Sequence, residues 1–332
     1  MRVLLLTALS TLTVSFLPAQ NAVPLRPPII DIHVHAAMSM AGQPACANTP
    51  AFLASDPKTE ESRFGWKPVP CANPLLPAKT PDSYAKEVLA EMERLNVTAV
   101  VMGSEDVVNQ WKNAAPNRVI RGTSFDAAAL SGARKEAELK RLRAAFTTGG
   151  FQVMGEIGLQ YQGMSPSDPA VEEYFALAEE LDIPVGIHMG TGGSGRANVT
   201  MPKFRGSMGD PLLLEELLAK HPKLRVWIMH AGYPMIDNLL TLLQASSHVY
   251  VDVAGLIWSY PIKEVNRYIQ RIVEAGFEDR VMYGTDQLLW PNLMAQSIDI
   301  IDKADYLTPE QKRNILYHNA ARFLRLEEKP RR

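Results

Sequence analysis

The chain has 332 residues, of which 46% are hydrophobic and 21% are charged. These proportions are typical of a globular protein that buries a sizeable core. Because the formal net charge is −2, the composition offers no electrostatic attraction to nucleic acid or to an anionic membrane.

The chain begins with the layout of a secretory signal peptide. Arg2 precedes an uncharged apolar stretch over residues 3–17, and small residues follow at 19–22. That stretch is shorter than the roughly 20 apolar residues that a membrane-spanning helix needs. We predict a signal peptide over residues 1–20 and a mature chain over 21–332, periplasmic or secreted, with no stable membrane insertion. An uncleaved anchor is the alternative.

The first strand is predicted over residues 29–34, at the end of an apolar run. It carries the sequence Asp31-Ile32-His33-Val34-His35. Alternate residues of a strand share a face, so His33 and His35 should point together. Two imidazoles on one rigid strand make half of a divalent-metal site, although such a pair can also be two polar residues at a strand end.

A long insertion follows this strand. Residues 36–80 are rich in Pro, Ala, Asn and Lys without a clear period, which predicts an inserted loop or lid. Both cysteines of the chain, Cys46 and Cys71, lie in it. In an oxidising compartment they predict one disulfide, worth roughly 3 kcal/mol in the chain-entropy model. Two unpaired thiols are the alternative.

After residue 80, short apolar runs alternate with amphipathic stretches. Strands are predicted over 97–103, 118–125, 152–158, 184–190, 224–230, 248–255 and 280–286. Helices are predicted over 81–95, 132–148, 168–181, 210–220, 235–245, 261–275, 291–303 and 309–318, and the weakest unit is 104–117. About eight β-α units predict a single-domain (β/α)8 TIM barrel. An open doubly wound sheet is the alternative, but no glycine fingerprint follows the first strand.

Functional residues of such a barrel lie where its strands end. The candidates at those positions are His33, His35, Glu156, His188, His230 and Asp286. Four of the seven histidines stand there, while His221, His248 and His318 lie elsewhere and are expected to be structural. Imidazole and carboxylate ligands suit a divalent metal; histidine-rich coordination favours Zn²⁺, with Mn²⁺, Fe and Ni as alternatives.

Several motifs of the chain together resemble the amidohydrolase superfamily. They are IIDIHVH, GEIGL, IPVGIHMG, VWIMHAGYP, YGTDQ and NAARFLRL, and the resemblance covers nearly all of residues 29–326. In architecture the chain looks like the amidohydrolase-related branch of metal-dependent hydrolases and decarboxylases. The GEIGL segment is also similar to TatD-like hydrolases.

The resemblance implies one or two metal ions. His33, His35 and Asp286 would hold one ion, with His188 shared or binding the same ion. Glu156 would bridge to a second ion that His188 and His230 also bind. Other roles stay open: a structural carboxylate at Glu156, a base or electrophile at His230 in a one-metal site, and a helix cap at Asp286. Asp31 could orient His33 or His35, or simply take a core hydrogen bond.

These residues predict an enzyme that cleaves an ester, lactone, amide or phosphoester bond of a small-molecule substrate with metal-activated water. Asp286 would accept the proton of the attacking water, and His230 could stabilise the developing oxyanion. The chain has no GxSxG elbow and no P-loop. The first alternative is a mononuclear non-oxidative decarboxylase, in which Glu156 would be surplus and an arginine would hold the carboxylate. The second is a non-catalytic binding protein.

Substrate contacts are less defined in the sequence. The glycine-rich segment 190–209 could move over the site, and its Arg196, Lys203 and Arg205 could hold a carboxylate or phosphate, or simply be solvated. Trp258, Tyr260 and Trp290 could line the pocket or pack against the lid. The sequence fixes neither the substrate nor the oligomeric state, and a homo-oligomer is compatible with it.

Overall fold

The computed structural model describes residues 26–36, 44–47, 71–192, 197 and 201–326, and the backbone of 52–55 and 62–65. The predicted signal peptide therefore lies outside the described residues. No helix in the described ranges has the length and apolar character needed to cross a membrane.

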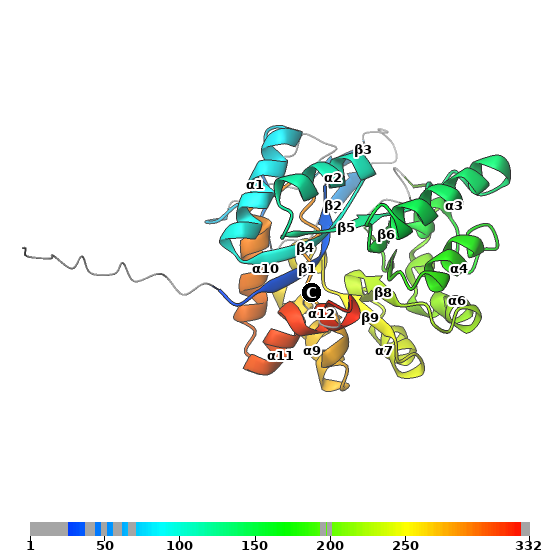
Figure 1. Ribbon diagram of the computed structural model, residues 1–332. Coiled ribbons are helices and arrows are strands. Elements are labelled where there is room, and N and C mark those ends of the chain that lie inside the picture. Colours follow the sequence, from blue (N-terminus) through cyan, green and yellow to red (C-terminus); the bar gives the residue numbers. More distant parts are fainter. Residues whose placement is uncertain are drawn as a thin grey trace, which may run out of the picture.

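Eight parallel strands form the centre of the molecule, and their order in the sheet follows the chain (Figure 1). They are β1 (Ile29–His35), β4 (Val97–Met102), β5 (Val119–Thr123), β6 (Val153–Ile157), β7 (Val185–His188), β8 (Val226–Met229), β9 (Val249–Asp252) and β10 (Val281–Met282). The Ile32 amide donates to the Tyr283 carbonyl and the Asp286 amide to the His33 carbonyl, which brings the first and last strands together. The (β/α)8 barrel is confirmed, and the open doubly wound sheet is wrong.

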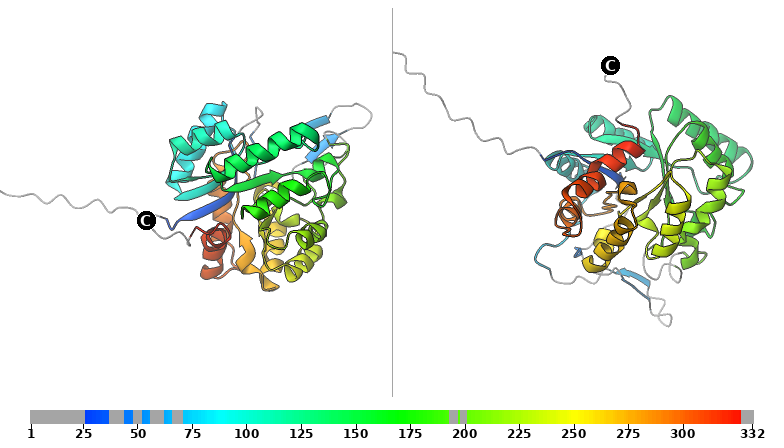
Figure 2. Two further views of the ribbon diagram at one scale, coloured as in Figure 1. Left: turned by 45° about the vertical axis from the view of Figure 1, so that its right-hand side comes forward. Right: turned by 90° about the horizontal axis from the view of Figure 1, so that it is seen from below.

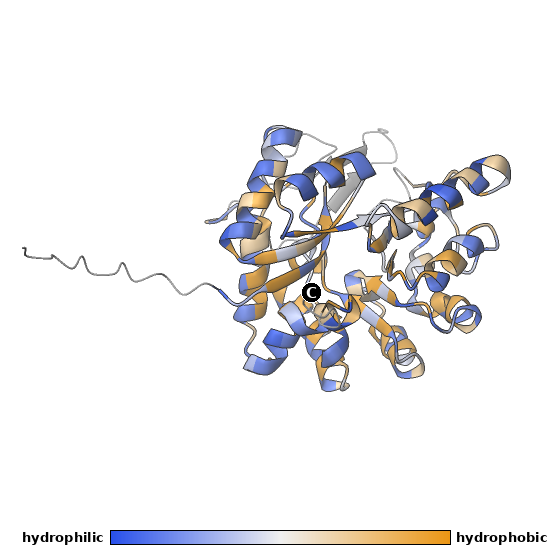
Figure 3. Cartoon of the chain, viewed as in Figure 1, coloured by the Kyte–Doolittle hydropathy of each residue, from blue (hydrophilic) through white to orange (hydrophobic). Residues whose placement is uncertain are grey.

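Helices surround the barrel, as the two further views show (Figure 2). They are α1 (Pro81–Arg94), α2 (Glu105–Ala114), α3 (Gly132–Thr147), α4 (Glu172–Glu180), α6 (Glu215–Lys220), α7 (Ile236–Ala245), α8 (Leu256–Ser259), α9 (Ile262–Glu274), α10 (Leu293–Asp302), α11 (Pro309–Arg313) and α12 (Asn319–Phe323). Hydrophobic residues concentrate on the strands and on the helix faces toward them, while the outward helix faces are hydrophilic (Figure 3). Burial of these apolar faces is the main force that holds the layers together.

A register shift in β1 decides which of its residues face the barrel interior. Pairing with β4 is irregular between Asp31 and Val34. Ile32 packs with apolar residues of several strands and of α12, whereas Val34 packs in the larger cluster that includes the helices. A strict alternation would have placed both side chains on the same face, so the irregularity re-aims the end of the strand, where His33 and His35 lie.

Several helical segments differ from the prediction. Helix α2 forms in the unit predicted to be weakest, because Val108 and Trp111 bury one of its faces. Helix α4 begins at Glu172, not at residue 168, since the Asp168 carboxylate accepts the Ala170 amide in a turn before it. The last helical segment does not end at 318 but continues through α12. Phe323 is buried there.

The insertion contains more regular structure than the loop predicted over 36–80. Strands β2 (Phe52–Ser55) and β3 (Ser62–Gly65) pair antiparallel and project from the barrel (Figure 2). Ala45 and Leu75 exchange two backbone hydrogen bonds, and a disulfide joins Cys46 to Cys71 beside them. Leu75 packs with Trp258, Trp290 and Leu293, which anchors the base of the insertion on the loops after the last two strands.

Candidate metal centre

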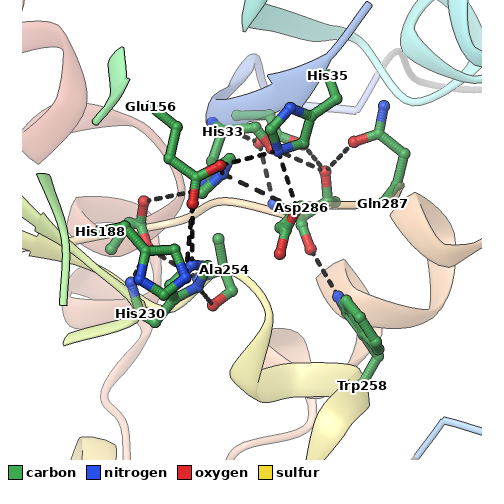
Figure 4. A network of polar contacts seen from close by, with 12 residues as sticks. His33, His35, Glu156, His188, His230, Ala254, Trp258, Asp286 and Gln287 are labelled. Carbon is green, nitrogen blue, oxygen red and sulfur yellow. Dashed lines mark hydrogen bonds and ion pairs between the residues drawn. The ribbon is translucent and has the colours of Figure 1, made fainter. Parts of the chain in front are cut away.

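All six predicted site residues gather at the carboxyl ends of the strands (Figure 4). His33 and His35 lie in β1, Glu156 in β6 and His188 at the end of β7. His230 follows β8 directly, and Asp286 lies in the loop after β10. Six residues spread over more than 250 positions of sequence thus share one mouth of the barrel, because parallel strands end at the same edge.

The two oxygens of Glu156 face two different groups of side chains. Glu156 Oε2 lies 3.4 Å from His35 Nε2 and 3.8 Å from His33 Nε2. Asp286 Oδ1 lies 3.1 Å and 3.9 Å from the same two nitrogens. We call His33, His35, Asp286 and Glu156 Oε2 the first ligand group.

On the other side, Glu156 Oε1 lies 3.6 Å from His188 Nε2 and 3.5 Å from His230 Nε2. These three atoms are the second ligand group. Two ligand atoms held about 2.1 Å from one tetrahedral ion are about 3.4 Å apart, which is close to the separations in both groups. The arrangement of donors therefore fits two divalent cations, one on each side of a shared carboxylate.

A buried nitrogen supports the fit independently. His33 is fully buried, and its Nε2 has no hydrogen-bond partner within the described part of the chain. Leaving such a group unsatisfied costs about 1–3 kcal/mol. Because this nitrogen points at the carboxylates of Glu156 and Asp286, a cation in the first ligand group would satisfy it.

The electrostatics keep Glu156 in its ionised form. Burial opposes ionisation, but the imidazoles of His230, His33 and His188 around it hold the pKa of this carboxyl well below its usual range. Burial likewise opposes charging of His33, yet the Asp252 carboxylate raises the pKa of this imidazole well above its ordinary value. Protons and cations thus compete for the same nitrogens, so we expect metal binding to release protons.

Asp252, at the end of β9, was not singled out from the sequence. It is fully buried, and its carboxylate accepts four N–H groups. Oδ2 accepts from His33 Nδ1 and Trp227 Nε1, both at 3.1 Å. Oδ1 accepts from the His230 amide at 2.8 Å and the Ala254 amide at 3.1 Å. The feature of the sequence that could have pointed to Asp252 is its position as a charged residue near the end of the apolar run 249–253.

Asp31 does not hold either imidazole. Its carboxylate accepts from the backbone amides of His33 and Thr285 and from the Thr285 hydroxyl. The core hydrogen bond, one of the two roles expected for Asp31, is the one found. Orientation of the His33 ring belongs to Asp252, because a carboxylate on Nδ1 fixes the proton there and leaves the Nε2 lone pair toward the ligand group.

The substitution Asp252→Asn is expected to weaken metal binding by about 10- to 100-fold, the usual effect of losing a group that orients a metal-ligating histidine. Asparagine offers one acceptor oxygen where aspartate offers two, and its side-chain NH₂ group would face N–H groups that the carboxylate now accepts from. Competition with a chelator measures the affinity. Asp237→Asn is the matched control, since Asp237 is exposed and pairs only with Arg271 among its described contacts. Equal affinity in wild type and Asp252→Asn would contradict the assignment.

Two neighbours of His188 were also missed. Gln160 and Tyr161 lie in η1 (Leu159–Gln162), the turn directly after β6. Gln160 Nε2 lies 2.8 Å from His188 Nδ1, and the Tyr161 hydroxyl lies 2.7 Å from His188 Nε2. A short turn has no periodic pattern, so nothing in the sequence marks these two side chains as contacts of a distant histidine.

The residues proposed for substrate contact are only partly placed. Arg196 lies outside the described residues. The Arg205 guanidinium donates to the carbonyls of Pro202 and Phe204, which ties it to its own loop. Trp258 and Trp290 are buried and pack against each other with ring centroids 5.2 Å apart. Packing under the insertion is therefore the role found for these two tryptophans.

Trp258 also supports the loop of Asp286. Its Nε1 donates to the Thr285 carbonyl at 3.0 Å, one residue before Asp286 (Figure 4). The remaining histidines lie outside both ligand groups. His221, which was expected to be structural, pairs with Glu179 and Glu172 between helices.

Comparisons with known proteins concern the family and the fold of the chain. The family model described as amidohydrolase matches residues 30–326. A search among curated protein sequences found no match. An uncharacterised TIM-barrel protein from Bordetella bronchiseptica is similar in structure, with a TM-score of 0.63, 17% identity, and coverage of 91% of this chain and 100% of that chain.

Two further structures carry activities in their descriptions. One is a probable 2-pyrone-4,6-dicarboxylic acid hydrolase from Acinetobacter baumannii, with a TM-score of 0.55, 13% identity, and coverage of 90% of this chain and 99% of that chain. The other is a 5-carboxyvanillate decarboxylase from Novosphingobium aromaticivorans, complexed with manganese. It has a TM-score of 0.55 and 17% identity, and the match covers 71% of this chain and 79% of that chain. At these identities the likeness establishes the fold alone.

Proposed function

Since this chain belongs to the amidohydrolase family, whose enzymes act on small molecules, we propose that it is a metal-dependent hydrolase that would hold two divalent cations, with Glu156 contributing one oxygen to each ligand group. Its substrate is a small organic molecule with an ester, lactone, amide or phosphoester bond. His33, His35 and Asp286 would hold the first cation, and His188 and His230 would hold the second. The nitrogen-rich ligand set favours Zn²⁺, with Mn²⁺ as the alternative.

One observation supports this proposal above the others: each oxygen of Glu156 faces its own group of ligand atoms. A one-metal decarboxylase would use a single group and would leave the bridging carboxylate and His230 surplus to the metal. A hydrolase and a decarboxylase both share the fold, so the fold does not choose between the two reactions. The position of Glu156 favours hydrolysis.

When bound, divalent cations would lower the pKa of water and polarise the bond to be broken. The proton transfers fall to side chains of the protein. Asp286 accepts the proton of the attacking water at its carboxylate and later returns it to the leaving group. Its backbone is fixed for this task by the hydrogen bond from its amide to the His33 carbonyl, at 2.8 Å.

His230 is held in one orientation beside Asp286 and Glu156. Its Nδ1 lies 2.7 Å from the Ala254 carbonyl, an acceptor, which places the proton on Nδ1 and the lone pair on Nε2. The Nε2 atom faces Glu156 Oε1. We therefore assign His230 to the second ligand group, in place of a separate role as a base.

We also propose that the enzyme acts in the periplasm or outside the cell. The support is the apolar N-terminal segment with its small residues at 19–22. A disulfide in the insertion is consistent with an oxidising compartment.

Isotope labelling distinguishes the two reactions. Purified enzyme is loaded with Zn²⁺ or Mn²⁺ and incubated in H₂¹⁸O with nitrophenyl esters, lactones, anilides and phosphodiesters, and separately with aromatic carboxylic acids. Hydrolysis places one ¹⁸O atom in a product, because water supplies the new oxygen. Release of CO₂ from the carboxylic acids, with no turnover of any ester, lactone, amide or phosphoester, would overturn the proposed reaction in favour of a decarboxylase.

A further inference from the structure

We propose that Gln160 and Tyr161 compete with the second cation for His188, so that the second ligand group binds its ion more weakly than the first. This inference rests on the proposed two-ion centre. It concerns how the chain itself sets the occupancy of the second position, and it follows from the hydrogen-bond partners of three histidines.

His33 and His230 are prepared to bind a cation. In each ring Nδ1 faces an oxygen that can only accept: the Asp252 carboxylate at 3.1 Å for His33 and the Ala254 carbonyl at 2.7 Å for His230. The proton of each neutral imidazole therefore lies on Nδ1, and the lone pair of Nε2 is available. Neither ring has to change its protonation site to become a ligand.

His188 has the opposite arrangement. The Gln160 amide nitrogen lies 2.8 Å from His188 Nδ1 and 3.2 Å from the Gly190 carbonyl. That carbonyl fixes the amide orientation, since an amide oxygen in the same place would be repelled. Gln160 therefore donates to Nδ1, and the proton of the neutral ring lies on Nε2, which donates to the Tyr161 hydroxyl at 2.7 Å.

The contact with Tyr161 is built into the fold around it. A Cβ atom on Gly158 would lie 2.9 Å from the Tyr161 ring, and one on Gly192 would lie 2.6 Å from its hydroxyl. Phe204 packs on the same ring with centroids 5.7 Å apart. Two glycines thus leave the space in which the tyrosine reaches His188, and the surrounding side chains hold it there.

For His188 Nε2 to bind a cation, its proton must move to Nδ1 and its bond to Tyr161 must break. Gln160 must also turn its amide oxygen toward Nδ1, which gives up the bond to the Gly190 carbonyl. Each hydrogen bond contributes about 0.5–1.5 kcal/mol. The second ligand group therefore carries a penalty that the first does not.

Removing the competition for His188 should strengthen binding of the second ion. Tyr161→Phe deletes one hydrogen bond and should lower the dissociation constant of the second ion about 2- to 12-fold. Gln160→Glu places a carboxylate on Nδ1, as Asp252 does for His33, and should lower it about tenfold or more. Tyr306→Phe is the matched control, because that hydroxyl bonds the Asn266 side chain and belongs to neither ligand group.

Titration with Mn²⁺, followed by the electron paramagnetic resonance signal of the free ion, measures both affinities without any substrate. Melting curves confirm that each variant is folded. The expected result is two unequal sites in wild type and a smaller difference in Tyr161→Phe and Gln160→Glu only. Unchanged affinities in both variants would overturn the competition while leaving the two-ion centre intact, and weaker binding in Tyr161→Phe would also overturn it. Only one bound ion per chain, in wild type and in all the variants, would overturn the proposed function as well.

Discussion

Asp286→Asn should lower kcat by about a thousandfold, within the 10²- to 10⁴-fold range of a lost general acid–base group. Asparagine has almost the same shape as aspartate, so the loop after β10 should keep its bond from the Asp286 amide to the His33 carbonyl. The amide cannot accept the proton of the attacking water or return it to the leaving group. Because Asp286 also belongs to the first ligand group, the variant is compared with wild type at saturating metal; substrate binding should then change much less than turnover, since the lost contribution belongs to proton transfer.

Steady-state kinetics with the best substrate from the labelling screen measure this loss. Asp302→Asn is the matched control: Asp302 is a partly exposed carboxylate that pairs with Arg26, on the outside of the barrel. Its kcat should equal that of wild type. A loss smaller than tenfold in Asp286→Asn would mean that another group moves the proton.

Glu156→Gln should remove the second cation and lower kcat at least about a hundredfold. The glutamine keeps one oxygen for one ligand group, but it turns an uncharged NH₂ group toward the other, where a cation would be repelled. His33, His35 and Asp286 remain for the first ion, so one ion per chain should be retained. The loss of negative charge also weakens cation binding, since a carboxylate would partly neutralise both cations.

Elemental mass spectrometry after dialysis compares the ion content of Glu156→Gln with that of wild type. Glu264→Gln provides the control, as Glu264 is partly exposed and pairs with Arg267 one turn away on α9. Equal ion content in Glu156→Gln and wild type would exclude a bridging role. A drop to no ion at all would mean that neither ligand group holds its ion without this carboxylate, which would contradict the retention of the first ion.

The barrel, and the gathering of the candidate ligand residues at one end of it, were predictable for a physical reason. Strands buried on both faces need continuous apolar runs, and a histidine or carboxylate at the end of such a run is conspicuous. The order of parallel strands then places all these ends at one mouth. In this way the sequence yields its six candidates: His33, His35, Glu156, His188, His230 and Asp286.

The residues that the sequence did not reveal act through contacts between distant segments. Asp252 matters because four donors converge on it, two from strands β1 and β8 and two from the segments that follow β8 and β9, and the sequence shows only an aspartate at the end of an apolar run. Tyr161 and Gln160 lie in a turn without periodicity. Strands β2 and β3 pair only with each other, in a segment whose composition resembles a loop.

The most direct test of the two-ion centre is anomalous X-ray diffraction from crystals grown with Mn²⁺. Two anomalous peaks are expected at the carboxyl ends of the strands, one beside each oxygen of Glu156. The peak near His33, His35 and Asp286 should be the stronger at limiting metal, and the peak near His188 and His230 should grow as the concentration rises. A single peak at saturating Mn²⁺, with Glu156 outside its coordination sphere, would contradict the account.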